Sequence, residues 1–369
     1  MEPIPFLSLA PQHAIIHNNV TEALKKGFEK NWYILGEDLK TFETDYARFT
    51  NVRHCLGVGN GYDALSISLQ ACNVRAGDEV IVPAHTYVAT WLAVSKCGAV
   101  IVPVEPDPSS MLINVERIEE KITAKTKVIL PVHLYGHPCD MTKIQGIASR
   151  HSATIIEDNA QAHGAKWNER RTGSFGAINA TSFYPTKNLG ALGDGGAITT
   201  DSDEIADFVR QYRNYGFERK NYCEVEGINS RLDELQASVL SIKLKCLDQW
   251  NHERRELADQ YIKRLYSVGD IQLPLPRKEA LPVYHLFVIR STKRDMLKAY
   301  LDSCQIDTMV HYPLPPHLQK PYASLNLQRG SLPLTEDIAH TCLSLPLWPG
   351  MTTSQIDRVC DCIVRFFSR

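Results

Sequence analysis

Short apolar runs rich in β-branched residues alternate with amphipathic stretches between residues 56 and 200. Some runs, such as DEVIVP at 78–83, are apolar nearly throughout, which is typical of strands buried on both faces of a sheet. The stretches between them carry apolar residues at helical spacing. We therefore predict an α/β fold with a mostly parallel sheet covered by helices. The predicted strands lie in HCLGVG, DEVIVP, AVIVPVE, KVILPVHL, ATIIED, ATSFYP and GGAITT.

The pattern changes near residue 231. An amphipathic stretch without glycine or proline covers 231–267, and we interpret it as a long helix that connects two domains. A proline-rich segment follows, then a short strand in YHLFVIR, a helix in RDMLKAYLDSC and a closing amphipathic helix in TSQIDRVCDCIVRFF. This order predicts a large domain over 1–240, with an N-terminal helical segment, and a smaller α+β domain over 241–369.

Composition and charge restrict the classes of partner. The 369 residues are 44% hydrophobic and 22% charged, as in ordinary globular proteins. The formal charge of -2 offers no basic surplus for nucleic acid. The N-terminal segment lacks the pattern of a signal peptide, and no stretch approaches the roughly 20 apolar residues of a membrane span. We expect a cytoplasmic protein that binds small molecules and copies of itself, with no nucleic acid and no membrane.

The cysteines and two histidines do not indicate a metal site. The ten cysteines are scattered without a C-x-x-C pair, and we interpret them as reduced structural thiols. Cys360 and Cys362 lie two apart in a predicted helix, where they point to different faces. His133 and His137 have ligand-like spacing, but the glycine and proline beside them break any helix that would bring them together. We interpret both as turn and strand-end residues, and expect no metal.

Two predicted strands end in residues of chemical interest. ATIIED ends in Glu157 and Asp158, and ligands of open α/β sheets gather beyond the carboxyl ends of the strands. The alternative for Asp158 is a turn or helix-capping residue. Lys187 follows the next strand, between a Tyr-Pro pair and a glycine-rich loop. In a pocket, desolvation lowers the pKa of such an amine and makes it nucleophilic, whereas the alternative is a solvated surface lysine.

The segment GVGNGYDALSISLQ runs from a strand into a helix. Its glycines at 57, 59 and 61 let backbone N–H groups approach an anion, and the helix N-terminus adds its dipole, so a phosphate is the expected ligand. The segment matches neither a P-loop nor G-x-G-x-x-G, which disfavours a nucleotide-dependent dehydrogenase. A phosphate cradle, an acid and an amine are together what pyridoxal 5'-phosphate needs: a Schiff-base lysine, and a carboxylate that keeps the pyridine nitrogen protonated.

At these residues the sequence resembles the DegT/DnrJ/EryC1/StrS family of nucleotide-sugar aminotransferases. The family uses pyridoxal 5'-phosphate on the fold-type-I, aspartate aminotransferase-like fold, with a large mostly parallel sheet domain and a smaller C-terminal domain. The resemblance covers nearly the whole chain, through motifs in family order: ILGEDLKTFETDYARF, NGYDALSISL, DEVIVPAHTYVAT, EDNAQAHGA, FYPTKNLGALGDGGA, GINSRLDELQA and HYPLPPHLQKPY.

The resemblance implies a role for each matching residue around the cofactor. Lys187, in K-N-L-G, would bond covalently to it, and Asp158 would pair with the pyridine nitrogen. Gln161 would hydrogen-bond the phenolic oxygen, and Tyr87 would stack on the ring. The phosphate would be held by Ser182 and by the backbone amides of Gly61 and Tyr62. The family commonly has threonine at the position of Tyr62, so only the backbone contact is implied there.

The resemblance also implies a homodimer and a reaction. Asn229, in N-S-R-L-D, would reach the phosphate of the neighbouring subunit, so that the active sites are shared. L-Glutamate would donate the amino group and a nucleotide-linked keto sugar would receive it, with Lys187 moving the proton in both halves. The segments around this lysine resemble those of members that aminate C3 of a dTDP-linked 3-oxo-6-deoxyhexose more than those that aminate C4.

Substrate contacts are assigned to fewer matching positions. Tyr184 and His311 would face the sugar, although His311 could instead be a loop histidine packed by prolines. Arg219 or Lys220 would contact the nucleotide's phosphates, in a segment that departs from the family's K-Y order. His163 either lines the cofactor pocket or satisfies a buried backbone group.

Three rival functions remain at this point. A C4 aminotransferase keeps the chemistry and changes the sugar carbon. A sugar dehydratase keeps the cofactor, but such relatives replace the lysine with histidine or need a cysteine cluster for iron and sulphur. A regulatory or scaffold protein would have no reason to retain Lys187, Asp158, Gln161 and the phosphate loop.

Overall fold

The main sheet contains all seven predicted strands. The computed structural model describes residues 2–368. Of the seven strands described in this sheet, only β9 runs against its neighbours, so the mostly parallel sheet is confirmed. In spatial order the strands are β1 (His54–Val58), β9 (Gly196–Thr200), β8 (Ile178–Ser182), β5 (Thr154–Asp158), β4 (Thr126–Ile129), β2 (Glu79–Pro83) and β3 (Val100–Val104).

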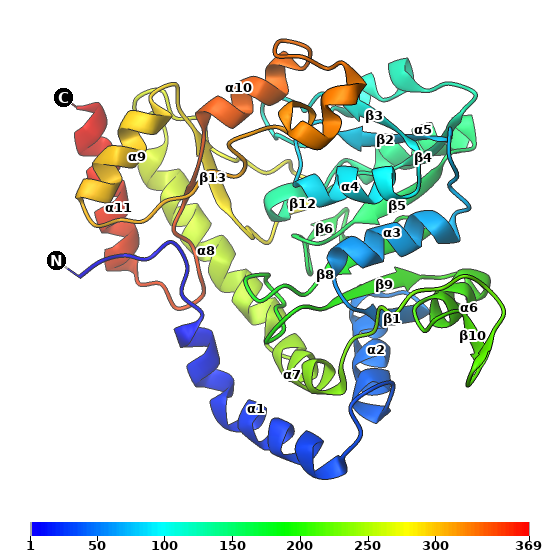
Figure 1. Ribbon diagram of the computed structural model, residues 1–369. Helices are drawn as coiled ribbons and strands as arrows, with labels where there is room; N and C mark the ends of the chain where they lie inside the picture. The colour runs from blue at the N-terminus through cyan, green and yellow to red at the C-terminus, as the bar shows by residue number, and fades with distance from the viewer. Residues whose placement is uncertain (1, 369) are drawn as a thin grey trace.

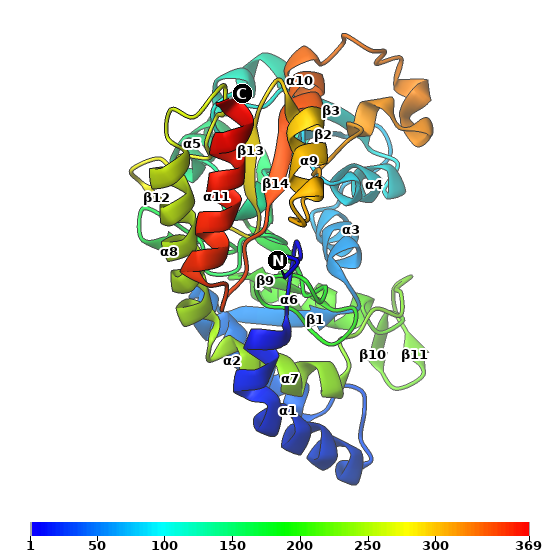
Figure 2. The same ribbon diagram turned by 90° about the vertical axis from the view of Figure 1, so that its left-hand side faces the viewer.

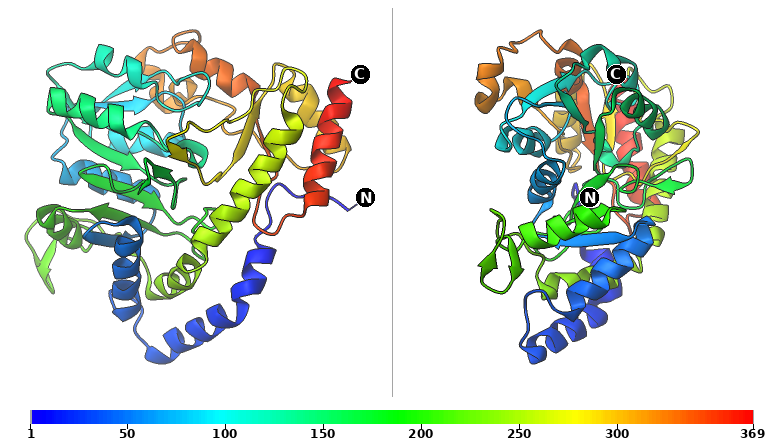
Figure 3. Two further views of the ribbon diagram at one scale, coloured as in Figure 1. Left: turned by 180° about the vertical axis from the view of Figure 1, so that it is seen from behind. Right: turned by 90° about the vertical axis from the view of Figure 1, so that its right-hand side faces the viewer.

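Helices cover both faces of this sheet, as the continuously apolar strands require. α3 (Gly61–Ala71) and α4 (Val88–Lys96) lie over one face, and α5 (Met141–His151) lies over the other (Figures 1 and 3). Strand residues such as Val80 and Ile129 are fully buried between them. Further elements of the large domain are α6 (Asp203–Tyr212), β6 (Lys166–Trp167), β7 (Arg170–Arg171), β10 (Phe217–Arg219), β11 (Tyr222–Cys223), η1 (Val115–Arg117), η2 (Glu119–Lys121) and η3 (Leu134–Gly136).

The stretch 231–267 forms two helices, so its interpretation as one helix was wrong. α7 (Glu234–Leu244) and α8 (Leu247–Leu265) are separated at Lys245 and Cys246, without glycine or proline. The two halves serve different hydrophobic cores. α7 packs with α1 (Ala10–Lys30) and α2 (Glu37–Thr50), whereas α8 packs against α11 (Thr353–Phe367). A break in direction lets each helix bury its own apolar side, and Figure 1 shows α8 running diagonally away from α7.

A second core lies beyond α8. It joins α8, α11 and α9 (Arg294–Ser303) to a two-stranded sheet of β13 (Phe287–Arg290) and β14 (Cys342–Leu345). β14 was not predicted. Ile4 belongs to this core through a bridge to Ile306, and Figure 2 shows the N-terminal segment close to these elements. The remaining elements are β12 (Ala280–Leu281), α10 (Pro333–Thr341), η4 (Pro316–Leu318) and η5 (Lys320–Leu325).

The domain boundary between 240 and 241 stays a prediction, and it falls inside α7. Among the helices of residues 2–368, none combines the length and the apolar character needed to cross a membrane.

Candidate active site

Strand direction brings three chemically distinct segments to one edge of the sheet. β1, β5 and β8 run the same way, so their carboxyl ends lie together. Asp158 ends β5 opposite Ala180 of β8, and Ser182 ends β8. Gly196 of β9 pairs with both Ser182 and Val58, which places the loop after β1 beside Ser182. The acid, the lysine loop and the glycine loop therefore share this edge.

Asp158 is a buried carboxylate with few donors. Its side chain accepts hydrogen bonds from the Thr90 hydroxyl and from the Ala160 backbone N–H, each at 3.1 Å. Burial raises the pKa of Asp158, and these two donors and the positive charge of Lys187 offset the rise only in part. A carboxyl group in this situation gains from an added cationic or N–H partner.

Lys187 lies in the loop after β8 and is half-buried. Its backbone N–H donates to the Tyr184 carbonyl at 2.9 Å, but its Nζ has no hydrogen bond or ion pair with any described residue. Burial lowers the pKa of Lys187 to about 8, although Asp158 acts in the opposite direction. A substantial fraction of this amine is neutral near physiological pH, and the neutral form is the nucleophile.

The charge of Lys187 acts on three histidines. Burial, followed by the charge of Lys187, lowers the pKa of His163 to about 3 and that of His311 to about 4. The pKa of His285 is also lowered, first by burial and then by the charge of Lys187. All three rings are therefore neutral at pH 7. The sequence reasoning missed His285, which stands in a segment interpreted only as a strand, and no local signal marks it.

His163 is fully buried beside Lys187, and its Nε2 bonds the Thr181 hydroxyl at 3.0 Å. His133 is also fully buried, paired with Glu157, and His137 packs edge-on against Tyr284. Within residues 2–368 no group of histidine, cysteine and acidic side chains could hold a metal ion.

The glycine loop forms a cradle at the start of α3. Asn60 caps the helix by accepting from the Asp63 N–H at 2.8 Å, and Gly61 is the first helical residue. Gly61 packs closely against Ser182: a Cβ on Gly61 would come within 2.5 Å of the Ser182 Cβ, so a larger residue would not fit there. The first N–H groups of a helix have no acceptor inside the helix. The amides of Gly61 and Tyr62 therefore lie beside the Ser182 hydroxyl as donors for an anion.

Gln161 and Tyr87 both contact Tyr312, which belongs to the C-terminal part of the chain. Gln161 accepts from the Tyr135 backbone N–H at 2.6 Å and donates to the Tyr312 hydroxyl at 3.1 Å. The Tyr87 ring is 53% exposed and lies 5.3 Å from the Tyr312 ring. The resemblance did not assign a role to Tyr312 or Tyr135, although HYPLPPH contains the first of them.

His311 contacts two segments that are distant from each other in sequence. Its Nδ1 is 2.8 Å from the Ser344 hydroxyl, and its carbonyl accepts from the Tyr135 hydroxyl. His311 is therefore more than a loop histidine packed by neighbouring prolines, because it hydrogen-bonds Ser344 of β14 and Tyr135 in the segment after β4. Tyr184 is 52% exposed and precedes the lysine loop.

Within residues 2–368, the structure shows no contact of Asn229, Arg219 or Lys220 with the other residues of this group, although Ser230, next to Asn229, accepts from the Gly59 N–H at 2.9 Å. All three are exposed. Arg219 lies in the β10–β11 hairpin, with its guanidinium 3.8 Å from the centre of the Tyr222 ring. The hairpin lies at the α6 end of the molecule in Figure 1. Their predicted contacts with cofactor and substrate phosphates stay predictions, and for Asn229 the prediction requires a second subunit.

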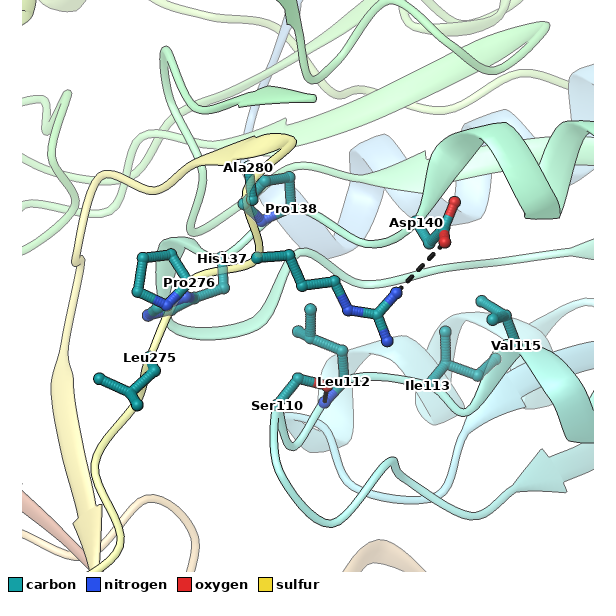
Figure 4. Close-up of a pocket in the computed structure, with 11 residues that line it drawn as sticks. Ser110, Leu112, Ile113, Val115, His137, Pro138, Asp140, Leu275, Pro276 and Ala280 are labelled. Carbon is teal, nitrogen blue, oxygen red and sulfur yellow. Dashed lines mark hydrogen bonds and ion pairs between the residues drawn. The ribbon is translucent and has the colours of Figure 1, made fainter. Parts of the chain in front are cut away.

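Two cavities differ in their relation to Lys187. The one in Figure 4 lies between the segment 110–115, the segment 137–140 and the loop 275–280. Arg277, one of the residues that line it, pairs with Asp140 at 3.2 Å. His137 lines it, but none of the residues assigned to the cofactor or the substrate does. The smaller cavity is lined by Lys187 itself, together with Lys243 and residues of α1.

The residues at the sheet edge fit pyridoxal 5'-phosphate. The N–H groups at the start of α3, beside the Ser182 hydroxyl, suit a phosphate, the unpaired Lys187 amine suits a carbonyl carbon, and the donor-poor Asp158 suits a protonated ring nitrogen.

Comparisons with known proteins agree with this site. The model of the DegT/DnrJ/EryC1/StrS aminotransferase family matches residues 14–364. The dTDP-3-amino-3,4,6-trideoxy-alpha-D-glucose transaminase of Streptomyces venezuelae is 44% identical over 366 residues, covering 99% of this chain and 97% of that protein.

Two solved structures are similar over the whole of this chain. DesV of S. venezuelae, in complex with a ketimine intermediate, has a TM-score of 0.98 at 44% identity and covers 100% of both chains. NtdA of Bacillus subtilis with bound cofactor PMP has a TM-score of 0.93 at 33% identity and covers 100% of this chain and 86% of that chain. The predicted fold-type-I architecture and the expectation of an enzyme are confirmed. The chain belongs to the DegT/DnrJ/EryC1/StrS aminotransferase family.

Proposed function

We propose that this protein transfers the amino group of L-glutamate to a nucleotide-linked keto sugar, dTDP-3-oxo-6-deoxyhexose, with pyridoxal 5'-phosphate as cofactor and the 3-amino sugar as product. The observation that carries the proposal is the unpaired Lys187 amine, which shares the sheet edge with Asp158 and with the start of α3 beside Ser182. Family membership and the 44% identical sugar 3-amino transaminase support the reaction and the carbon.

Each residue of the site has a proposed task. When bound, the cofactor supplies an electron sink for negative charge that develops on the reacting carbon. Asp158 holds a proton on the ring nitrogen, and Ser182 with the amides of Gly61 and Tyr62 holds the phosphate. Gln161 donates to the phenolic oxygen with its second amide hydrogen, and Tyr87 covers the ring.

Lys187 is the proposed acid and base. Because its pKa is about 8, its amine can accept a proton from the carbon of the donor and return one to the carbon of the product near neutral pH. Tyr184 and His311 would orient the sugar, and Arg219 or Lys220 would contact the nucleotide's phosphates. The nucleotide then serves as a binding group remote from the reacting carbon.

A homodimer completes this proposal. Asn229, which is exposed in one chain, would reach the phosphate in the other subunit. Exposed apolar side chains at the end of α1 support a contact with a second subunit. Phe28 is 72% and Trp32 63% exposed, and large exposed apolar groups mark contact surfaces. All ten cysteines are free, which supports the proposed cytoplasmic location.

The visible absorbance of the purified protein tests both halves of the reaction. We expect a cofactor band that L-glutamate bleaches and dTDP-3-oxo-6-deoxyhexose restores. A band insensitive to glutamate would favour another donor or a sugar dehydratase. A protein that stays colourless with added cofactor would favour a regulatory or scaffold role.

A competition between the 3-oxo and 4-oxo sugars tests which carbon receives the amino group. We expect dTDP-3-oxo-6-deoxyhexose to be aminated in preference to its 4-oxo isomer, with the product identified by NMR. Preference for the 4-oxo isomer would establish the C4 alternative in place of the C3 proposal.

A further inference from the structure

The loop that carries Lys187 is held from behind by a buried pair of asparagines. Asn188, which is 4% exposed, follows the lysine directly, and Asn251 of α8 is 1% exposed. The Asn188 amide donates to the Asn251 side-chain oxygen at 2.8 Å and to the Val283 carbonyl at 3.0 Å. The Asn188 oxygen lies 3.3 Å from His285 Nδ1. The side chain next to the lysine therefore has partners on two other segments.

Asn251 extends this contact to the segment that follows Asp158. Its amide donates to the His163 carbonyl at 2.7 Å. The next residue, Gly164, has a φ of +86°, and a Cβ there would come within 2.9 Å of the Asn251 amide nitrogen. Glycine is thus needed for the close approach. One side chain of α8 joins the lysine loop to the segment of the acid.

The geometry leaves little freedom to this pair. The Asn251 NH₂ group must face the His163 carbonyl in order to donate to it, so the side-chain oxygen of Asn251 faces Asn188. The orientation of the Asn251 side chain thereby determines which end of the Asn188 side chain faces it. An apolar pair of the same size would leave buried carbonyl groups without donors. Buried polar networks that are fully satisfied specify one arrangement of the segments they join.

Two further side chains, one on α7 and one on α8, bond the lysine loop and the segments near it. Lys243, 5% exposed on α7, donates to the Gly190 carbonyl of the lysine loop at 2.6 Å. Arg254, one turn beyond Asn251, donates to the carbonyls of Tyr284 and Leu347, each at 3.1 Å. The face of α8 that bonds the lysine loop is therefore also fixed to the C-terminal part of the chain.

We propose that Asn251 is a positioning residue for Lys187: through Asn188 it holds the lysine loop, and through the His163 carbonyl it keeps that loop in register with the segment of Asp158. The inference rests on the proposed role of Lys187. It adds a residue of α8 that touches neither the sugar nor the cofactor in the proposed function.

The test uses the full-length protein without cofactor, and its variants Asn251→Ala, Asn188→Ala and the double variant. The readout is the pH dependence with which an amine-selective reagent modifies Lys187, quantified by mass spectrometry against the exposed Lys320. Titratable groups near the Lys187 amine are Asp158, His163, His285 and His311, and the cavity that Lys187 lines also contains His13 and Lys243. None of them is changed.

We expect each single variant to raise the midpoint for Lys187 modification by about one pH unit from its starting value, because a loosened loop admits water to the amine. The double variant should shift the midpoint by less than the sum of the two single shifts, because the two side chains share the hydrogen bond between them. In the loaded enzyme, kcat should fall about tenfold with little change in KM, as expected for a misplaced reacting group.

Leu257→Ala is the matched structural control. Leu257 lies on the same helix, is 6% exposed and packs in the second core, so its truncation lowers the melting temperature without touching the lysine loop. An Asn251→Ala midpoint that equals the wild-type value, or that moves no more than in Leu257→Ala, would overturn the proposal. Additive shifts in the double variant would also overturn it.

One outcome separates this proposal from the proposed function. A shifted Lys187 midpoint with unchanged turnover would support the positioning of Lys187 and contradict its catalytic role. If Asn251→Ala does not fold, Asn188→Ala carries the same test, because it leaves the bond from Asn251 to the His163 carbonyl in place.

Discussion

Glu157 and Asp158 are neighbours on β5 with opposite environments. Glu157 is fully buried, lies 2.7 Å from His133 Nε2, and accepts from the backbone N–H groups of Gly173, Phe175 and Gly176. Burial alone would raise the pKa of Glu157, but His133 and these N–H groups outweigh it and lower the pKa. For Asp158 burial prevails, and the pKa is raised.

The difference teaches how to separate a structural acid from a functional one. Successive side chains of a strand point to opposite faces, so two adjacent acids enter unrelated surroundings. The partners of Glu157 are all supplied by the fold, whereas Asp158 is left with two donors and an unpaired lysine amine nearby. An acid that the fold does not satisfy is the one available to a ligand.

The largest effect is expected at the amine that faces Asp158. Lys187→Ala should reduce turnover by about 10³-fold or more, since it removes both the nucleophile and the proton carrier. The melting temperature should change little, because the Lys187 Nζ bonds no described residue. Glutamate-dependent amination and thermal unfolding measure the two effects, and normal turnover would refute the mechanism.

Asp158→Asn should lower kcat by about 10²-fold, because a neutral amide cannot hold a proton on the ring nitrogen. The fold should be retained or slightly stabilised, since the change removes a buried charge that the protein satisfies poorly. Steady-state kinetics and the melting temperature distinguish this result from simple unfolding.

Glu157→Gln should show the reverse pattern. We expect a loss of about 1–3 kcal/mol in the free energy of unfolding, because backbone donors lose a charged acceptor, with activity kept by the folded protein. The wild-type contribution is present above the ordinary glutamate pKa of 4.5 and is lost as pH falls through the lower folded value. The variant should lack this acid-dependent loss, which urea unfolding at several pH values can measure.

The smallest expected effect is a shift in the pH dependence of cofactor capture by Lys187. The rate at which the cofactor-free protein captures pyridoxal 5'-phosphate should fall about tenfold per unit below the Lys187 pKa, because only the neutral amine reacts. That pKa is about 8, and Asp158 raises it. Asp158→Asn should therefore move the midpoint to lower pH, while Glu157→Gln should leave it in place. Equal shifts in both variants would mean that the two acids do not differ as described.

Several features could be predicted from the sequence because their signals are local. Each of the seven apolar runs became a strand, and TSQIDRVCDCIVRFF became α11 over its full length. The order of the glycine loop, Asp158 and Lys187 along the chain placed all three at strand ends. β14 was missed because its apolar residues follow α10 without a turn signal, and its pairing partner β13 lies far away in sequence.

The sequence by itself determined the strands, the edge at which the chemistry lies and the residue types present there, since periodicity and chain direction are local properties. Only the tertiary structure decided that Glu157 is satisfied and Asp158 is not, that His285 and Asn251 stand behind the lysine loop, and that 231–267 breaks into two helices. Burial and hydrogen-bond partners come from segments distant in the chain, and no local pattern encodes which of two adjacent acids will find its donors.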